Sequence, residues 1–223
     1  MKFNHIISLG GDCLPRVSTT KYGIKRSKAQ GELSCPFDLA VTNSNDMVKL
    51  LVNDFTNYVN PDYLYEKIVD GVKIISNKKY QGLFFNHESK FMTSIDFCCN
   101  NYEFLIQRYN ERVLNFKSYI NDNNILFVIN CRDHININEL VNTLKKLYPF
   151  LLFEIVVIHL YKCVNVIVDE NDKKIHYLKY FMNDIWNSND DQLKFVTDLV
   201  GKFVEYATKD DNTFPIGEKL DLL

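Results

Sequence analysis

A cysteine that closely follows a pair of glycines is the residue of this sequence best placed for chemistry. The run His5 to Leu9 is apolar and has the length of a buried strand. Gly10 and Gly11 then allow a sharp turn, and Pro15 is typical of the first turn of a helix. The pattern predicts strand, turn and helix, with Cys13 at or beside the helix N-cap. The unpaired N–H groups and partial positive charge of a helix N-terminus favour a thiolate, so Cys13 is predicted to be a nucleophile.

The same turn offers groups that could hold a negatively charged oxygen. We expect the N–H groups around Gly10, Gly11, Asp12 and Leu14 to form an oxyanion or anion-binding site. A structural alternative stays open, because cysteine is often a small buried core residue and glycine pairs also serve simply as tight turns.

A nucleophilic thiol needs a base within hydrogen-bond reach, and histidine is the usual choice. The chain has five histidines, at positions 5, 87, 134, 159 and 176. His87 follows a short predicted strand and is the first choice. His134 follows another strand, has Asp133 beside it, and is the second choice. The other three lie within or at the ends of apolar strands and are interpreted as structural.

An acidic residue usually orients the base of such a site. Asp38, in the sequence Pro36-Phe37-Asp38, is the preferred candidate. The alternative is a structural role, because aspartate in this position often bonds backbone N–H groups in a turn or at a helix start.

The segment Ile7-Ser8-Leu9-Gly10 followed by Cys13, together with the Pro36-Phe37-Asp38 element, resembles a family classed as papain-like cysteine peptidases of bacteria and viruses. The family pattern has a histidine after an aromatic stretch, which Phe84 to His87 resembles. It also has an acidic segment with tryptophan, which Asn183 to Trp186 resembles weakly. Leu39 stands where the family usually has tryptophan. The resemblance implies a thiol-dependent enzyme.

A second resemblance concerns the fold. Gly11-Asp12-Cys13 after a strand is similar to the Gly-Asp-Ser opening of lipases and esterases with a flavodoxin-like sheet, with cysteine in the serine position. That class carries its histidine near the C-terminus, whereas no histidine follows His176 here. The resemblance therefore supports a fold and not a catalytic triad.

Alternating strands and helices predict the architecture. Ile125–Ile129 and Phe153–Ile158 are continuously apolar strands that flank a helical pattern at Asn138–Tyr148, which indicates parallel neighbours buried on both faces. Further strands are expected at 72–75, 83–85, 164–168 and 175–178, and further helices at 14–22, 42–55, 102–120 and 191–206. We predict one three-layer α/β domain over residues 1–223 with a mainly parallel central sheet and a loosely held tail from about 207. Sites in such sheets form at the carboxyl ends of strands, so Cys13 and the segment Asn130–His134 are expected at one rim.

The composition limits the kinds of molecule that the protein is expected to bind. A net charge of −2 gives no electrostatic case for nucleic acid or an anionic membrane, and no apolar run is long enough to span a bilayer. The six cysteines include no C-x-x-C pair, so we predict free thiols, no metal and no cofactor, in a reducing cytoplasm. The sequence leaves the oligomeric state open.

The leading hypothesis is a thiol-dependent acyl enzyme, either a hydrolase of amide or ester bonds or an acyltransferase, acting on a small molecule, a peptide or an acylated glycan. One alternative is a non-catalytic module whose glycine turn and helix N-terminus bind an anion. Another is a glycan-associated accessory protein. No complete nucleotide-binding glycine motif is present.

Overall fold

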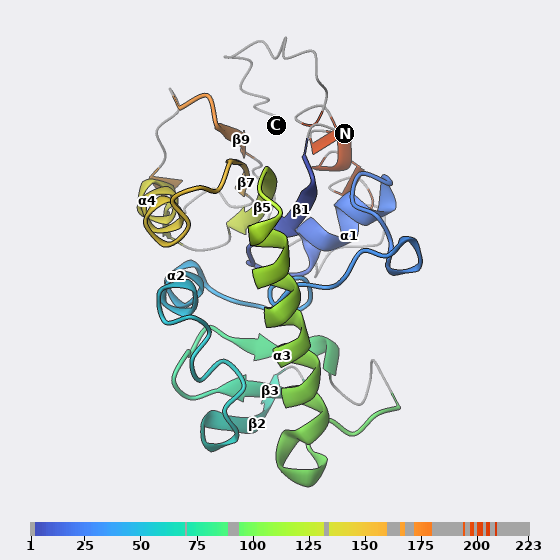
Figure 1. The fold of residues 1–223 in the computed structure, drawn as a ribbon. Helices are drawn as coiled ribbons and strands as arrows, with labels where there is room; N and C mark the ends of the chain where they lie inside the picture. Colours follow the sequence, from blue (N-terminus) through green and yellow to red (C-terminus); the bar gives the residue numbers. More distant parts are fainter. Residues whose placement is uncertain are drawn as a thin grey trace.

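A four-stranded parallel sheet lies in the upper half of the view in Figure 1. The computed structural model describes residues 3–69, 71–88, 94–131, 134–159, 166–167 and 172–179, and near the C-terminus residues 194, 197–198, 200–202, 204–205 and 208. The sheet strands, in the spatial order β1-β5-β7-β9, are β1 (His5–Ser8), β5 (Ile125–Cys131), β7 (Phe153–His159) and β9 (Ile175–Lys179). All neighbouring pairs are parallel, which confirms the predicted α/β class.

Strand β5 is apolar throughout most of its length because both of its faces are covered. Alternate side chains of a strand point to opposite faces. Phe127 and Ile129 accordingly belong to one hydrophobic cluster, and Leu126 and Val128 to a second one. All seven residues of the strand are buried, so the uninterrupted apolar run is the sequence signature of a central parallel strand.

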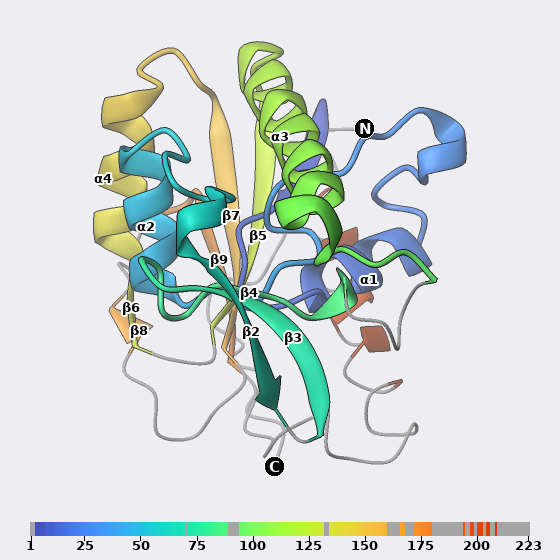
Figure 2. The ribbon, with the colours of Figure 1, turned by 90° about the horizontal axis from the view of Figure 1, so that it is seen from below.

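Helices cover the two faces of this sheet. Helix α1 (Leu14–Lys21) contributes Leu14 to the cluster that contains Leu126 and Val128. The opposite cluster contains side chains of α2 (Ser44–Val52), α3 (Cys99–Asn121) and α4 (Ile137–Leu147). Figure 2 shows α2 beside α4 at the left and α1 at the right. The three layers that the sequence predicts are therefore present.

A second sheet lies below the first in Figure 1. Two of its strands were predicted, at 72–75 and 83–85, but its first strand and its separation from the parallel sheet were not. This second sheet is antiparallel, in the order β2-β3-β4, with β2 (Leu64–Val69), β3 (Val72–Asn77) and β4 (Phe84–Phe85). Three short 3-10 helices, η1 (Lys28–Gln30), η2 (Pro61–Tyr63) and η3 (Asn86–Glu88), and a parallel strand pair, β6 (Ile135–Asn136) with β8 (Val166–Ile167), complete the assigned elements. Figure 1 shows α3 running from this antiparallel sheet up to β5.

Two helices begin or end a few residues away from the bounds predicted from the sequence. Helix α2 ends at Val52 and not near Phe55, because Asp54 and Phe55 both adopt positive φ. In α3, residues 100–102 have left-handed angles, so regular helical geometry begins close to the predicted start at Tyr102.

Part of the C-terminal prediction lies outside the described residues. The segment Asn183–Trp186 and the tail after 208 are not described, and of the predicted helix at 191–206 the described positions are helical. Within the described chain, no helix has both the length and the apolar character needed to cross a bilayer.

Candidate active site

The turn between β1 and α1 has a backbone that only glycine adopts readily. Gly10 has φ +100° and Gly11 has φ +81°, in the region that other residues resist. At Gly11 the space is also closed, because an added Cβ would lie 2.0 Å from the backbone oxygen of Asn130 on β5. The glycine pair therefore lets the turn pass directly against the neighbouring strand.

Cys13 is the N-cap residue of α1, as the sequence predicts. The residue is 8% exposed. Asp12 bonds the first turn of the helix, since its Oδ1 accepts the N–H of Leu14 at 2.8 Å. The N–H of Gly11 donates to the carbonyl oxygen of Thr42 at 3.2 Å. The N–H groups of Gly11 and Leu14, two of the expected oxyanion donors, therefore already have partners inside the protein.

The segment Val41–Thr42 links the glycine turn to the strand that precedes His87. Thr42 forms an isolated antiparallel bridge with Gly11, and Val41 forms another with Phe84 of β4. Hydrogen-bonded strands lie about 4.8 Å apart, so Gly11 and Phe84 are separated by roughly 10 Å across this segment. Cys13 follows Gly11 by two residues and His87 follows Phe84 by three, so Val41–Thr42 connects the segments that hold the two candidate residues.

His87 lies in η3, directly after β4. Its Nε2 is buried and has no hydrogen-bond partner among the described residues. Burial lowers the pKa of the imidazole; the charge of Glu88 opposes this shift, Arg112 adds to it, and Asp12 opposes it. A lowered pKa keeps the imidazole neutral near pH 7, the state in which it can accept a proton.

Glu88, the neighbour of His87, anchors η3 to α3. Its carboxylate lies 3.5 Å from Nη1 of both Arg108 and Arg112, and it accepts the hydroxyl of Tyr109 at 3.0 Å. The Glu88 side chain is fully buried. Because a buried carboxylate requires such partners, Glu88 has a structural role that fixes the position of His87.

Asp38 is fully buried beneath α1. Its Oδ1 lies 3.4 Å from Nζ of Lys25, and its Oδ2 lies 3.6 Å from Nη1 of Arg16 and accepts the N–H of Cys35 at 2.9 Å. These contacts tie Asp38 to α1 through Arg16. None of the contacts described for the Asp38 carboxylate involves His87.

Phe37 of the Pro-Phe-Asp element packs against the glycine turn. The ring of Phe37 is 3.9 Å from the point where a Cβ of Gly10 would lie, and its carbonyl accepts the Ser8 hydroxyl at 3.5 Å. The two sequence motifs that carry the family resemblance are thus in contact.

The remaining histidines have other surroundings. Three of them bond other side chains: His5 with Asp122 at 2.8 Å, His159 with Tyr177 at 2.7 Å, and His176 with Glu154 at 2.6 Å. His134, the second-choice base, is exposed just after β5, and its neighbour Asp133 lies outside the described residues.

The other thiols differ from Cys13 in setting. The cysteines that the structure describes form no disulfide. Burial raises the pKa of Cys35, and burial together with Glu66 raises the pKa of Cys98 to about 11. Both thiols are therefore protonated near neutral pH. The described part of the chain holds no cluster of three or more His, Cys, Asp or Glu arranged for a metal ion.

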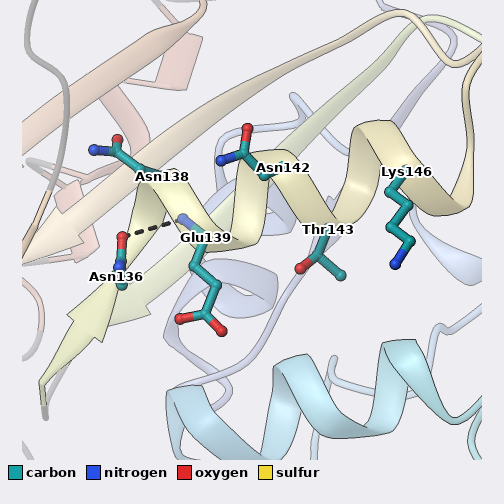
Figure 3. A pocket seen from close by; sticks show the side chains of 6 residues that line it. All are labelled: Asn136, Asn138, Glu139, Asn142, Thr143 and Lys146. Atoms are coloured by element: carbon teal, nitrogen blue, oxygen red, sulfur yellow. Dashed lines mark hydrogen bonds between the residues drawn. The ribbon is translucent and has the colours of Figure 1, made fainter.

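A pocket of about 350 Å³ lies along α4 (Figure 3). The residues that line it are Asn136, Asn138, Glu139, Asn142, Thr143 and Lys146. The hydrogen bond drawn in Figure 3, from the N–H of Glu139 to Oδ1 of Asn136, is the N-cap of α4. The pocket contains none of the residues predicted for the site.

Two residues that contact the glycine turn were not among the predicted site residues. Asn130 of β5 donates its side-chain N–H to Oδ1 of Asp12 at 2.9 Å, and Thr42 bridges Gly11. The sequence could have identified Asn130, because it is a polar residue near the end of an otherwise apolar strand. Nothing in the sequence marks Thr42, because its role lies in its backbone.

The sequence model of one known family, described as putative papain-like cysteine peptidase, matches residues 4–162. No match was found to a curated protein or to a solved structure. The matched region contains Cys13, Asp38, His87 and Asn130.

Proposed function

Because the chain belongs to the family of putative papain-like cysteine peptidases, we propose that it is a thiol-dependent acyl enzyme with Cys13 as the nucleophile. The family supports a hydrolase in general terms.

One observation carries the proposal. The turn that holds Cys13 at the N-terminus of α1 is connected through Val41–Thr42 to the strand that delivers His87. A thiol at a helix N-terminus and a neutral imidazole in the same region are the two components that thiol catalysis requires.

In the proposed reaction, His87 accepts the proton of the Cys13 thiol. The sulfur then attacks a carbonyl carbon, an S–C bond forms, and the carbonyl electrons move to the oxygen. Collapse of this intermediate breaks the bond to the leaving group, which takes the proton from His87 and leaves a thioester on Cys13. Water completes hydrolysis, whereas a second nucleophile would complete acyl transfer.

The N-terminus of α1 is the proposed stabiliser of the oxyanion, because its partial positive charge lies beside the sulfur. The N–H groups of Gly11 and Leu14 bond Thr42 and Asp12. Their use as oxyanion donors therefore requires them to exchange partners when a carbonyl oxygen enters. The turn from Gly10 to Leu14 remains the proposed site.

Asp38 is the proposed acidic member of the site. Its contacts indicate that it acts by holding Arg16 and Lys25 beneath α1, and so by fixing the helix that begins at Cys13. The pair His134 and Asp133 is the second proposal for the base. The family supports an amide substrate, such as a peptide, ahead of an ester or an acylated glycan.

The test uses p-nitrophenyl acetate as a generic acyl donor and mass spectrometry of the intact chain and its peptides. We expect acetylation of Cys13 with release of nitrophenolate near pH 7.5. Cys13→Ser should abolish the thioester and His87→Gln should slow its formation, while His134→Gln is the matched control and should leave the rate unchanged. Acetylation of His134→Gln at a reduced rate, with His87→Gln unaffected, would transfer the role of base to His134.

Absence of any acetyl group on Cys13, with the protein folded, would refute the acyl-enzyme proposal. Acetylation of Cys99, an exposed thiol, under the same conditions is the internal reference.

A further inference from the structure

A buried asparagine on the neighbouring strand β5 contacts three residues of the turn that precedes Cys13. The backbone N–H of Asn130 donates to the carbonyl oxygen of Gly10 at 3.3 Å. Its side-chain N–H donates to Oδ1 of Asp12 at 2.9 Å. Its own carbonyl oxygen lies where a Cβ on Gly11 would need space. Gly10, Gly11 and Asp12, the three residues before Cys13, thus each contact Asn130.

The position of Asn130 in β5 explains why a polar side chain stands there. Alternation along the strand puts Asn130 on the same face as Leu126 and Val128, which pack on the α1 side of the sheet. The side chain of Asn130 comes to the start of α1, where it meets Asp12. Asn130 is 1% exposed, and an amide at that depth is costly unless it forms hydrogen bonds.

Asp12 transmits this contact to the helix. Its Oδ1 accepts two hydrogen bonds, one from Asn130 and one from the N–H of Leu14. Cys13 lies between the two residues so joined, as the N-cap of α1. A carboxylate held by two donors has little freedom to rotate, so the backbone at Cys13 is fixed on both sides.

The side-chain amide of Asn130 is oriented by its hydrogen bond to Asp12. Its Oδ1 is buried and has no partner within the part of the chain that the structure describes. A buried carbonyl oxygen without a partner costs free energy, and the side chain keeps this arrangement because its N–H group is held by Asp12.

From these contacts we propose that Asn130 is a positioning residue of the active site, which acts through Asp12 to fix Cys13 at the N-terminus of α1. The inference rests on the proposed function of Cys13. It adds a residue of β5 to a site otherwise built from the β1–α1 turn and η3.

The experiment measures second-order rate constants for alkylation of Cys13 by iodoacetamide in the full chain, with peptide mapping to separate the thiols. We expect Asn130→Ala to lower the rate roughly tenfold, the factor that corresponds to loss of one hydrogen bond to a charged group. Asp12→Ala should lower it as well. The double variant should match Asp12→Ala within about twofold, because residues that act in series are not additive.

Asn77→Ala is the matched control. Asn77 is also 1% exposed, and its side chain donates to the carbonyl oxygens of Asn57 and Tyr58 and accepts the N–H groups of Lys79 and Tyr80. It lies in β3, away from the turn. Its loss should lower stability without changing the rate at Cys13.

If Asn130→Ala fails to fold, swapping the two side chains between positions 12 and 130 tests the same contact. Asn130→Asp keeps the shape of the side chain but places a second carboxylate against Asp12, and should slow alkylation. Adding Asp12→Asn restores a donor and an acceptor in the pair and should return the rate toward that of the wild type.

Three results would overturn the inference: a wild-type rate in folded Asn130→Ala, multiplicative effects in the double variant, or an equal loss of rate in Asn77→Ala. Failure of the proposed function is separate, because it would appear as a wild-type Cys13 that reacts no faster than in the unfolded chain.

Discussion

Replacing Gly11 with alanine tests whether the nucleophile turn depends on its close approach to β5. Two costs are expected. The first is conformational, because Gly11 has φ +81°. The second is steric, because the new Cβ would lie 2.0 Å from the oxygen of Asn130, which is backbone and cannot rotate away.

Gly31 separates these two costs. It has φ +86°, and a Cβ added there would meet nothing within 4 Å. Gly31→Ala should therefore lower the free energy of unfolding by about 1–2 kcal/mol, the cost of the left-handed conformation alone. Gly11→Ala should lose a further 1–3 kcal/mol, roughly, because the strand or the turn must move as in an overpacked core.

Urea unfolding followed by far-UV circular dichroism measures both variants, and iodoacetamide alkylation of the folded proteins measures the effect on Cys13. We expect slower alkylation of Cys13 in Gly11→Ala and no change in Gly31→Ala. Equal losses of stability in the two variants, with Cys13 alkylated at the wild-type rate in both, would refute the claim that contact with Asn130 shapes the turn.

Three further predictions concern the buried charges and the imidazole. Asp38→Asn leaves Lys25 and Arg16 without their counter-ion, so the free energy of unfolding should fall by about 3–5 kcal/mol in urea titrations; a loss below about 1 kcal/mol would contradict the buried ion cluster. Glu88→Gln leaves Arg108 and Arg112 without their counter-ion, so the free energy of unfolding should fall. It should also slow reactions of Cys13 that need His87, as measured by the acetylation rate; an unchanged rate would show that Glu88 does not position the imidazole. Because burial lowers the pKa of His87, the unfolded chain binds its proton more readily, so stability should be lost as the pH falls below about 6.5, and less so in His87→Gln; identical pH profiles of stability in the two proteins would contradict the shift.

The parallel sheet was predictable because its signal is local. The apolar runs in β5 and β7 and the helical pattern of α4 between them identify a buried strand–helix–strand unit without reference to distant residues. The turn at Cys13 was predictable for the same reason, since Gly10, Gly11 and Pro15 restrict the backbone directly.

The antiparallel sheet was not predictable in the same way. Strand β2 has one buried residue and otherwise partly or fully exposed ones, so its sequence carries neither an apolar run nor a clear alternation. It is held by pairing with β3. Such pairing depends on the partner strand, and propensity alone does not reveal it.

The site was predictable only in part. His87 follows β4 as expected, but the connection between its strand and the turn before Cys13 runs through backbone bridges at Val41 and Thr42. Backbone bridges leave no trace in residue type. Asp38 was identified as a candidate acid, yet nothing in residue type or spacing pairs it with its cationic partners Arg16 and Lys25.

The most direct test of the central claim compares the alkylation rate of Cys13 by iodoacetamide at pH 7 in the folded chain with its rate in the chain unfolded by urea, resolved by peptide mapping. A thiol activated by the N-terminus of α1 and by His87 should react faster in the folded protein, while Cys35 and Cys98 react more slowly than in the unfolded chain. Cys13 reacting in the folded protein no faster than in the unfolded chain would contradict the account.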